Sequence, residues 1–131
     1  MEGAGSLSFT LSAPTKLLNQ LLRMHWSKRR KHQQALSWEV KILTSGKRPA
    51  VPFARAKVRV ERHSLREPDV DGMIGGFKHL LDCLLPHSDR HPNGLGIIAD
   101  DNPRCLQLEP VSVLVKHRAD QKTVVLIEEQ P

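Results

Sequence analysis

The sequence predicts an α+β fold in a single small domain, residues 1–131, with the element order β-α-β-α-β-β. Apolar and polar residues alternate at residues 7–11 and 54–63, which is typical of half-buried strands, and two further strands are expected near the end of the chain. Apolar residues recur every three or four positions in two longer segments, which is typical of helices packed on a sheet. The hydrophobic content of 39% is enough for one modest core. We therefore expect a mixed or antiparallel sheet with helices packed on it.

The first half of the chain predicts a strand and a helix separated by a basic segment. Residues 7–11 alternate and predict the first strand. Residues 16–31 follow no single period and are interpreted as a basic loop that leads into a helix. The helix is expected over residues 27–44, and Gly46 favours its end there. Its apolar residues near helical spacing are Ala35, Leu36, Trp38, Ile42 and Leu43.

The middle of the chain predicts a second strand and a second helix. Residues 54–63 alternate strictly, which predicts a strand with an apolar inner face and a basic outer face. Residues 73–85 place Phe77, Leu80 and Leu84 at helical spacing, so a helix is expected there. Pro86 favours its end.

The last third predicts a loop and two strands. Residues 86–96 are rich in His, Pro, Asn and Gly and are expected to form a polar loop. Strands are expected over residues 106–116 and 123–128. Residues 117–121 between them are interpreted as the turn of a hairpin.

The charge balance favours a polyanionic partner. Twenty Lys and Arg residues against fourteen Asp and Glu residues give a net charge of +6, and nucleic acid is the partner that this charge favours most. No apolar run approaches the roughly 20 residues that span a bilayer, so no membrane partner is expected. The first twelve residues lack the features of a secretory signal, and two free cysteines suit a reducing compartment, so a cytoplasmic location is expected. The absence of Tyr argues against a single-strand-binding platform and favours recognition of DNA backbone and shape.

Two groups of acids are candidate metal ligands. Asp69 and Asp71 lie two residues apart, so on an extended segment both side chains point to one face, as a hard divalent cation requires. The alternative is that Asp71 caps the following helix and Asp69 is an ordinary turn acid. Asp100 and Asp101 form the second group, for which a solvated turn is the alternative.

The combination of these acids in a basic chain favours phosphodiester hydrolysis. Carboxylates hold Mg²⁺ in such sites, and the ion stabilises negative charge and activates water. Lys78 lies four residues before Asp82 on the predicted helix. The two residues form either a simple surface pair or a flank that reaches the acids, where Lys78 would stabilise a phosphate.

These motifs resemble the RusA family of Holliday-junction resolvases along nearly the whole chain. The elements that carry the resemblance are Arg23-Met24-His25-Trp26, Asp69-Val70-Asp71, Lys78, Leu81-Asp82-Cys83-Leu84 and Gly96-Ile97-Ile98-Ala99-Asp100-Asp101. The resemblance implies that Asp69, Asp71 and Asp101 are metal-binding acids and that Lys78 is the catalytic lysine. It also matches Asp82 and Asp100 to further acids of the site.

The resemblance further implies a crossover junction endodeoxyribonuclease of DNA recombination and repair. Such an enzyme works as a homodimer, uses Mg²⁺, with Mn²⁺ as an alternative ion, and resolves four-way DNA junctions by paired symmetric nicks. The long loop at residues 86–95 is common in phage-borne relatives. Cations expected to hold the DNA backbone are Arg23, Lys28, Arg29, Arg30, Lys31, Arg55, Lys57 and Arg59. For the run at residues 28–31, a solvated helix face is an equally good interpretation.

Two departures from the family pattern leave alternatives open. Gly72 stands where the family usually has Asn, and an insertion at residues 73–76 precedes Lys78. These departures motivate the alternative of an inactive relative that binds branched or duplex DNA. A second alternative is a structural or regulatory basic protein whose acids are caps and turns. A metal role for His87 and His91 is disfavoured, because the Pro and Gly residues around them make a helical register improbable.

Overall fold

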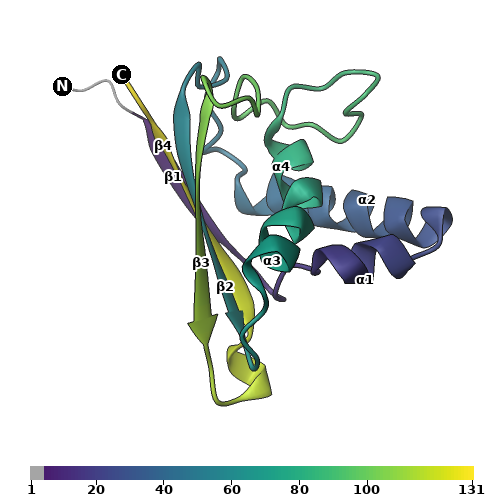
Figure 1. The fold of residues 1–131 in the computed structure, drawn as a ribbon. Coiled ribbons are helices and arrows are strands. Elements are labelled where there is room, and N and C mark those ends of the chain that lie inside the picture. The colour runs from purple at the N-terminus through teal and green to yellow at the C-terminus, as the bar shows by residue number, and fades with distance from the viewer. Residues whose placement is uncertain (1–4) are drawn as a thin grey trace.

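The computed structural model describes residues 5–131 and confirms an α+β fold. One four-stranded sheet carries all the helices α1–α4 on a single face, as Figure 1 shows. The elements, in chain order, are β1 (Ser6–Leu11), α1 (Leu18–Arg23), α2 (Trp26–Leu43), β2 (Ala56–Ser64), α3 (Val70–Gly76), α4 (Lys78–Leu84), β3 (Leu106–Leu114), the 3₁₀ turn η1 (Arg118–Asp120) and β4 (Lys122–Glu129). None of the helices in this part of the chain is long and apolar enough to cross a bilayer.

The sheet is mixed, with the strand order β1-β4-β2-β3. Strand β4 runs antiparallel to both β1 and β2, whereas β2 and β3 are parallel. The predicted hairpin between the last two strands is therefore wrong, because β2 lies between them. The helices α3 and α4 form the crossover that places β3 parallel to β2 at the edge of the sheet. The chain after β3 then passes through η1 and across the end of β2 before it enters β4 on the other side of β2.

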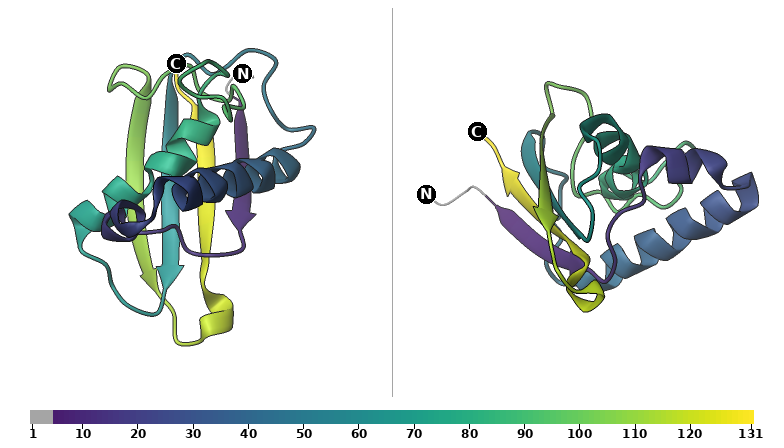
Figure 2. Two further views of the ribbon diagram at one scale, coloured as in Figure 1. Left: turned by 90° about the vertical axis from the view of Figure 1, so that its right-hand side faces the viewer. Right: turned by 60° about the horizontal axis from the view of Figure 1, so that its bottom comes forward.

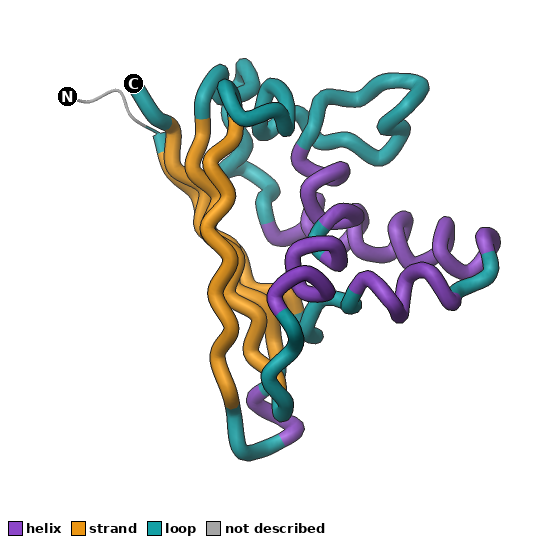
Figure 3. The backbone as a smooth tube through the Cα atoms, viewed as in Figure 1, coloured by secondary structure: helices purple, strands orange, loops and turns teal. Residues whose placement is uncertain are grey.

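The core lies between the sheet and the helices, as the two layers in Figure 2 and Figure 3 make clear. Val58, Val60 and Val125 are fully buried on the helix-facing side of the central strands. Phe77 and Leu80 are fully buried on the helical side and meet them. The alternation that predicted the inner face of β2 is confirmed.

The helices depart from prediction at two places. The segment interpreted as a basic loop contains α1, whose single buried residue is Leu21. The helix predicted over residues 73–85 begins earlier and divides at Phe77 into α3 and α4, since the Phe77 amide donates to the Ile74 carbonyl at 3.1 Å. The helix predicted over residues 27–44 is confirmed as α2.

A close crossing of α3 over the chain that leads into α1 explains the glycines of the insertion at residues 73–76. A Cβ atom on Gly76 would overlap the carbonyl oxygen of Lys16. At Gly75 a Cβ atom would meet the Leu18 side chain at 2.9 Å. Glycine allows this approach because it has no side chain, so α1 packs on α3 with almost no space between the backbones.

Substitution of Gly76 by Ala should therefore lower the free energy of unfolding. The new methyl group would force the Lys16 backbone away, and such overpacking costs about 1–3 kcal/mol. Gly75→Ala is the matched comparison, because it offers the same gain in helix propensity but its methyl group would meet the Leu18 side chain and no backbone atom, so it should cost less stability. Urea unfolding of both variants measures the difference, and equal midpoints would contradict the crossing as described.

Candidate functional site

A hollow of about 250 Å³ lies where α1, α2, α3 and α4 meet. Leu18, Leu21, Leu22, Arg29, Gln33, Gly75, Lys78, His79 and Asp82 line it. One wall is apolar and comes from α1, while the opposite wall carries polar and charged groups of α2 and α4. Two residues expected at the catalytic site, Lys78 and Asp82, therefore share one hollow with Arg29, which was expected to bind DNA.

Lys78 and Asp82 form an ion pair with unequal exposure. The Lys78 Nζ atom lies 3.6 Å from Asp82 Oδ1, and the Lys78 side chain is 70% exposed whereas that of Asp82 is 12% exposed. The Oδ1 atom of Asp82 is buried and receives no hydrogen bond from the part of the chain that the structure describes, residues 5–131. Buried carboxylate oxygens without a donor are uncommon and call for a functional explanation. A simple surface pair does not describe this arrangement.

His91 links Asp82 to the loop that precedes β3. Its Nδ1 atom lies 3.9 Å from Asp82 Oδ1. Asp100 lies near enough for the charge of His91 to lower the pKa of its carboxyl slightly. The larger cause of that lowered pKa is a hydrogen bond of 2.7 Å from the Asp101 amide, joined by one of 2.9 Å from the Asn102 side chain. His91 therefore lies beside the candidate acid Asp82, a contact that the pattern of the sequence does not predict.

Asp69 and Asp71 lie at the start of α3. Asp69 is the N-cap, and its carboxylate accepts a hydrogen bond of 3.0 Å from the Gly72 amide. A Cβ atom on residue 72 would come within 2.7 Å of Asp69 Oδ1, so Gly72 leaves space for the capping carboxylate. Asp71 lies in the first turn of the helix, and both carboxylates are exposed. The capping role thus belongs to Asp69, and the alternative that assigned it to Asp71 is wrong.

Asp71, Lys78 and Asp82 follow one another along the α3–α4 pair. Asp71 precedes Gly75 by four residues, so it lies one turn beyond the hollow on the same side of α3. Asp71 belongs to α3, whereas Lys78 and Asp82 belong to α4. We call these three residues the α3–α4 stripe.

The three acids expected to share a metal ion lie on different parts of the fold. Asp101 precedes β3, at the end of the sheet where the parallel strand β2 begins, whereas Asp69 and Asp71 follow the opposite end of β2. Across residues 5–131, no three Asp, Glu, His or Cys side chains form a group that could hold a metal ion. A three-carboxylate centre of Asp69, Asp71 and Asp101 does not fit this structure. Asp71 lies in the first turn of a helix and not on the extended segment on which the two side chains were expected to share one face. Mg²⁺ is commonly held by one or two carboxylates together with water and phosphate oxygens, and the carboxylates of Asp69 and Asp71 are both exposed to such an ion.

The cations expected to bind DNA divide between two surfaces. Lys28, Arg30 and Lys31 are exposed on α2, and Arg23 is exposed at the end of α1. Lys57 and Arg59 instead lie on the outer face of the sheet, which no helix covers (Figure 2). The expected basic outer face of β2 is largely neutralised, because ion pairs join these two residues to neighbouring glutamates. The pairs are Lys57 with Glu109 at 3.8 Å, Arg59 with Glu109 at 3.5 Å and Arg59 with Glu61 at 2.8 Å.

A pair of histidines lies beside the hollow and carries no signal in the sequence. His32 Nδ1 and His79 Nδ1 are 3.1 Å apart, so one ring donates a hydrogen bond and the other accepts it. Burial is the largest cause that lowers the pKa of both imidazoles. The charge of Lys16 lowers the pKa of His32 further. The pKa of His79 is lowered further by His32, Arg29 and Lys78, whereas the negative charge of Asp82 raises it. Forty-seven residues separate the two rings, so only the packing of α2 on α4 brings them together.

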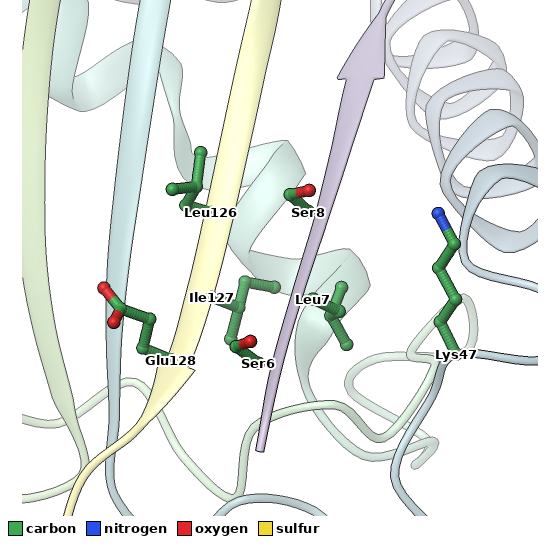
Figure 4. Close-up of a pocket in the computed structure, with 7 residues that line it drawn as sticks. All are labelled: Ser6, Leu7, Ser8, Lys47, Leu126, Ile127 and Glu128. Carbon is green, nitrogen blue, oxygen red and sulfur yellow. The ribbon is translucent and has the colours of Figure 1, made fainter. Parts of the chain in front are cut away.

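A larger hollow lies elsewhere and contains none of the predicted site residues. It measures about 600 Å³ and is lined by Ser6, Leu7, Ser8, Lys47, Leu126, Ile127 and Glu128. Figure 4 shows its two charged side chains, Lys47 and Glu128, on opposite sides of the hollow. Small hydroxyl and aliphatic groups between them offer no arrangement for catalysis, so the hollow beside α4 remains the candidate site.

Comparisons with known proteins leave the family open. No protein-family model, curated protein or solved structure matches this chain. The functional argument therefore depends on the residues themselves and on the resemblance that their motifs carry.

The histidine pair should make folding stability depend on pH. Because the pKa values of His32 and His79 are lowered in the folded chain, the unfolded chain binds more protons below about the ordinary value of 6.5. Stability should accordingly be complete above that pH and decrease as the pH falls from about 7 toward 5. Urea unfolding at several pH values should show a smaller decrease for His79→Gln than for the wild-type chain.

The control for this measurement is His117→Gln, since His117 is exposed before η1 and far from the pair. It should keep the wild-type pH dependence. Identical pH profiles for all three proteins would show that the pair does not titrate differently on folding.

Proposed function

We propose that this chain is a Mg²⁺-dependent endonuclease that resolves four-way DNA junctions by paired symmetric nicks, as its resemblance to the RusA family implies. The observation that carries the proposal is the α3–α4 stripe beside Arg29. Asp71, Lys78 and Asp82 follow one another there in the order that the resemblance requires, with a largely buried carboxylate next to an exposed ammonium group. A buried carboxylate oxygen without a hydrogen-bond donor calls for an explanation, and a role at a functional site is one.

The residues of the stripe, together with Asp69 and Arg29, have separate roles in this proposal. Asp69 and Asp71 would hold the ion, leaving its other positions to water and DNA phosphate oxygens. Bound Mg²⁺ supplies charge stabilisation and a more acidic water. Lys78 is exposed enough to reach a phosphate oxygen and neutralise its charge, while Asp82 orients the ammonium group from its shielded position. Arg29 would bind a second phosphate from the wall formed by α2.

Paired nicks favour a homodimer. Two cuts related by a two-fold axis are most simply made by two copies of one site. In this proposal the exposed cations of α1 and α2 grip the DNA backbone by charge and shape, without reading its sequence.

A non-catalytic binder of branched or duplex DNA is the second candidate. One observation favours it: no three potential metal ligands come together within residues 5–131. This candidate keeps the cationic surface of α1 and α2 and predicts tight binding with no Mg²⁺-dependent nicks.

Cleavage of a labelled four-way junction distinguishes the two candidates. Wild-type protein should produce symmetric nicks with Mg²⁺ and none with EDTA, as read on a denaturing gel. Asp71→Asn should lower the cleavage rate by about 100-fold or more, because the charge stabilisation that a held ion supplies is worth several kcal/mol and each 1.4 kcal/mol changes the rate tenfold.

The control for cleavage is Asp120→Asn, which removes an exposed acid from η1 and should keep wild-type activity. Binding without nicks from every protein would favour the second candidate. Nicks that persist in Asp71→Asn would exclude the proposed role of Asp71.

Two double variants test which cations bind DNA. Lys28→Ala with Arg30→Ala removes two exposed charges from α2, whereas Lys57→Ala with Arg59→Ala removes two charges that are paired with glutamates. The first should lower affinity for DNA and reduce the slope of log K against log salt by about 2, since each phosphate contact contributes about 0.9. The second should change that slope by much less. Fluorescence anisotropy over a salt series measures both, and equal slopes for the two variants would overturn the assignment to α2.

A further inference from the structure

The turn between α1 and α2 exposes two large apolar side chains. Leu22 is 66% exposed and Trp26 is 64% exposed. Figure 1 and the right-hand view of Figure 2 both place this turn at the end of the helical layer that lies away from the sheet. Exposed apolar groups at the tip of a projecting hairpin do not stabilise the fold of one copy, so they are available to a partner.

The tip is an ordered part of the chain. His25 is the N-cap of α2, and its Nδ1 atom accepts a hydrogen bond of 3.2 Å from the Ser27 amide. The imidazole also lies against the indole of Trp26, with ring centroids 5.4 Å apart. The cap therefore holds Trp26 at the first position of α2, where its outer surface remains open.

The charge around the tip identifies the class of partner. Five cations lie within residues 17–38, and the sequence contains no acidic residue between Glu2 and Glu39. These cations are Arg23, Lys28, Arg29, Arg30 and Lys31. Residues 17–38 therefore carry a net charge of +5, out of +6 for the whole chain. Aromatic and apolar groups among cations, with no acidic residue in the same segment, complement a partner that has both negative charge and flat apolar surfaces. Nucleic acid is such a partner, because its phosphates carry the charge and its bases provide the flat surfaces.

We propose that Trp26, with Leu22 beside it, is a wedge that stacks on bases exposed at the branch point of a DNA junction. This inference rests on the proposed function and names how the same site selects its substrate. Inside a continuous duplex a wedge must first separate stacked base pairs, which costs a few kcal/mol per step. At a branch point the end faces of the base pairs are easier to reach, so the same contact favours junctions over linear DNA.

The location of the wedge agrees with the candidate site. Leu22 and Arg29 both line the hollow that contains Lys78 and Asp82. A base held against Trp26 would therefore bring the adjoining phosphates to Arg29 and then to Lys78. The second tryptophan differs in this respect, because Trp38 lies along α2 outside the hollow and Lys41 Nζ lies 5.5 Å from the centre of its ring.

Trp38 provides a matched control, since it is 63% exposed on the same helix. The experiment measures binding by anisotropy in EDTA, so that no cleavage occurs, to a four-way junction and to a linear duplex of equal nucleotide content. Trp26→Ala should lower affinity for the junction at least about fivefold, the effect expected for loss of one stacked base, and change affinity for the duplex less than twofold. Trp38→Ala should change neither, and Trp26→Phe should restore most of the preference.

Fluorescence supplies a second readout. Trp26 and Trp38 are the only tryptophans, so Trp38→Phe leaves Trp26 as the single emitter. Its emission should be quenched more strongly by the junction than by the duplex, and 2-aminopurine placed at the branch point should respond when the protein binds.

The possible outcomes separate this inference from the proposed function. If wild-type protein nicks junctions but Trp26→Ala keeps the junction preference, or weakens both DNAs equally, the wedge is overturned and the nuclease proposal stands. If the wild-type chain binds neither DNA, both are overturned. Binding of Trp38→Phe to phosphatidylserine vesicles with a blue shift of Trp26, and no response to the junction, would assign the tip to a membrane surface and overturn the wedge.

Discussion

The close crossing of α3 over the segment that leads into α1 is the contact on which the arrangement of the helical layer depends. Gly76 faces the Lys16 carbonyl so closely that a methyl group has no space between them. This contact fixes α1 against α3, and the short turn after α1 then directs α2 across α4. The hollow that contains Lys78 and Asp82 forms between these helices, so its walls depend on a backbone contact that only glycine permits.

The electrostatics of the hollow follow from that packing. Asp82 is shielded by the surrounding helices and by His91, while Lys78 remains largely exposed. A carboxylate in this position strengthens its interaction with a nearby cation, because less water screens the charge. The same burial keeps His32 and His79 uncharged near neutral pH. The helical layer thus presents the exposed ammonium group of Lys78 and the exposed cations of α2, Lys28, Arg30 and Lys31, to any anionic ligand.

The two faces of the molecule differ in whether their cations form ion pairs with acidic side chains. On the outer face of the sheet, cations of β2 are paired with glutamates of β2 and β3, as cross-strand neighbours of opposite sign commonly are. The sequence of α1 and of the first half of α2 contains five cations and no acidic residue. The net charge of the chain is therefore concentrated on the hairpin of α1 and α2, and this asymmetry gives the molecule one side suited to a polyanion.

The α+β class, the strands at residues 7–11 and 54–63, and α2 follow from local pattern, because alternation and helical spacing report directly on which side chains face a core. The net positive charge and the positions of the acids along the chain are likewise properties of the sequence. Packing in three dimensions is what places β2 between β3 and β4, breaks the helix at Phe77 and brings His91 and the histidine pair beside Asp82. It likewise decided that Asp69 and Asp71 lie apart from Asp101. Pairing of strands and the meeting of distant side chains depend on packing between segments far apart in the chain, and local periodicity carries no information about such contacts.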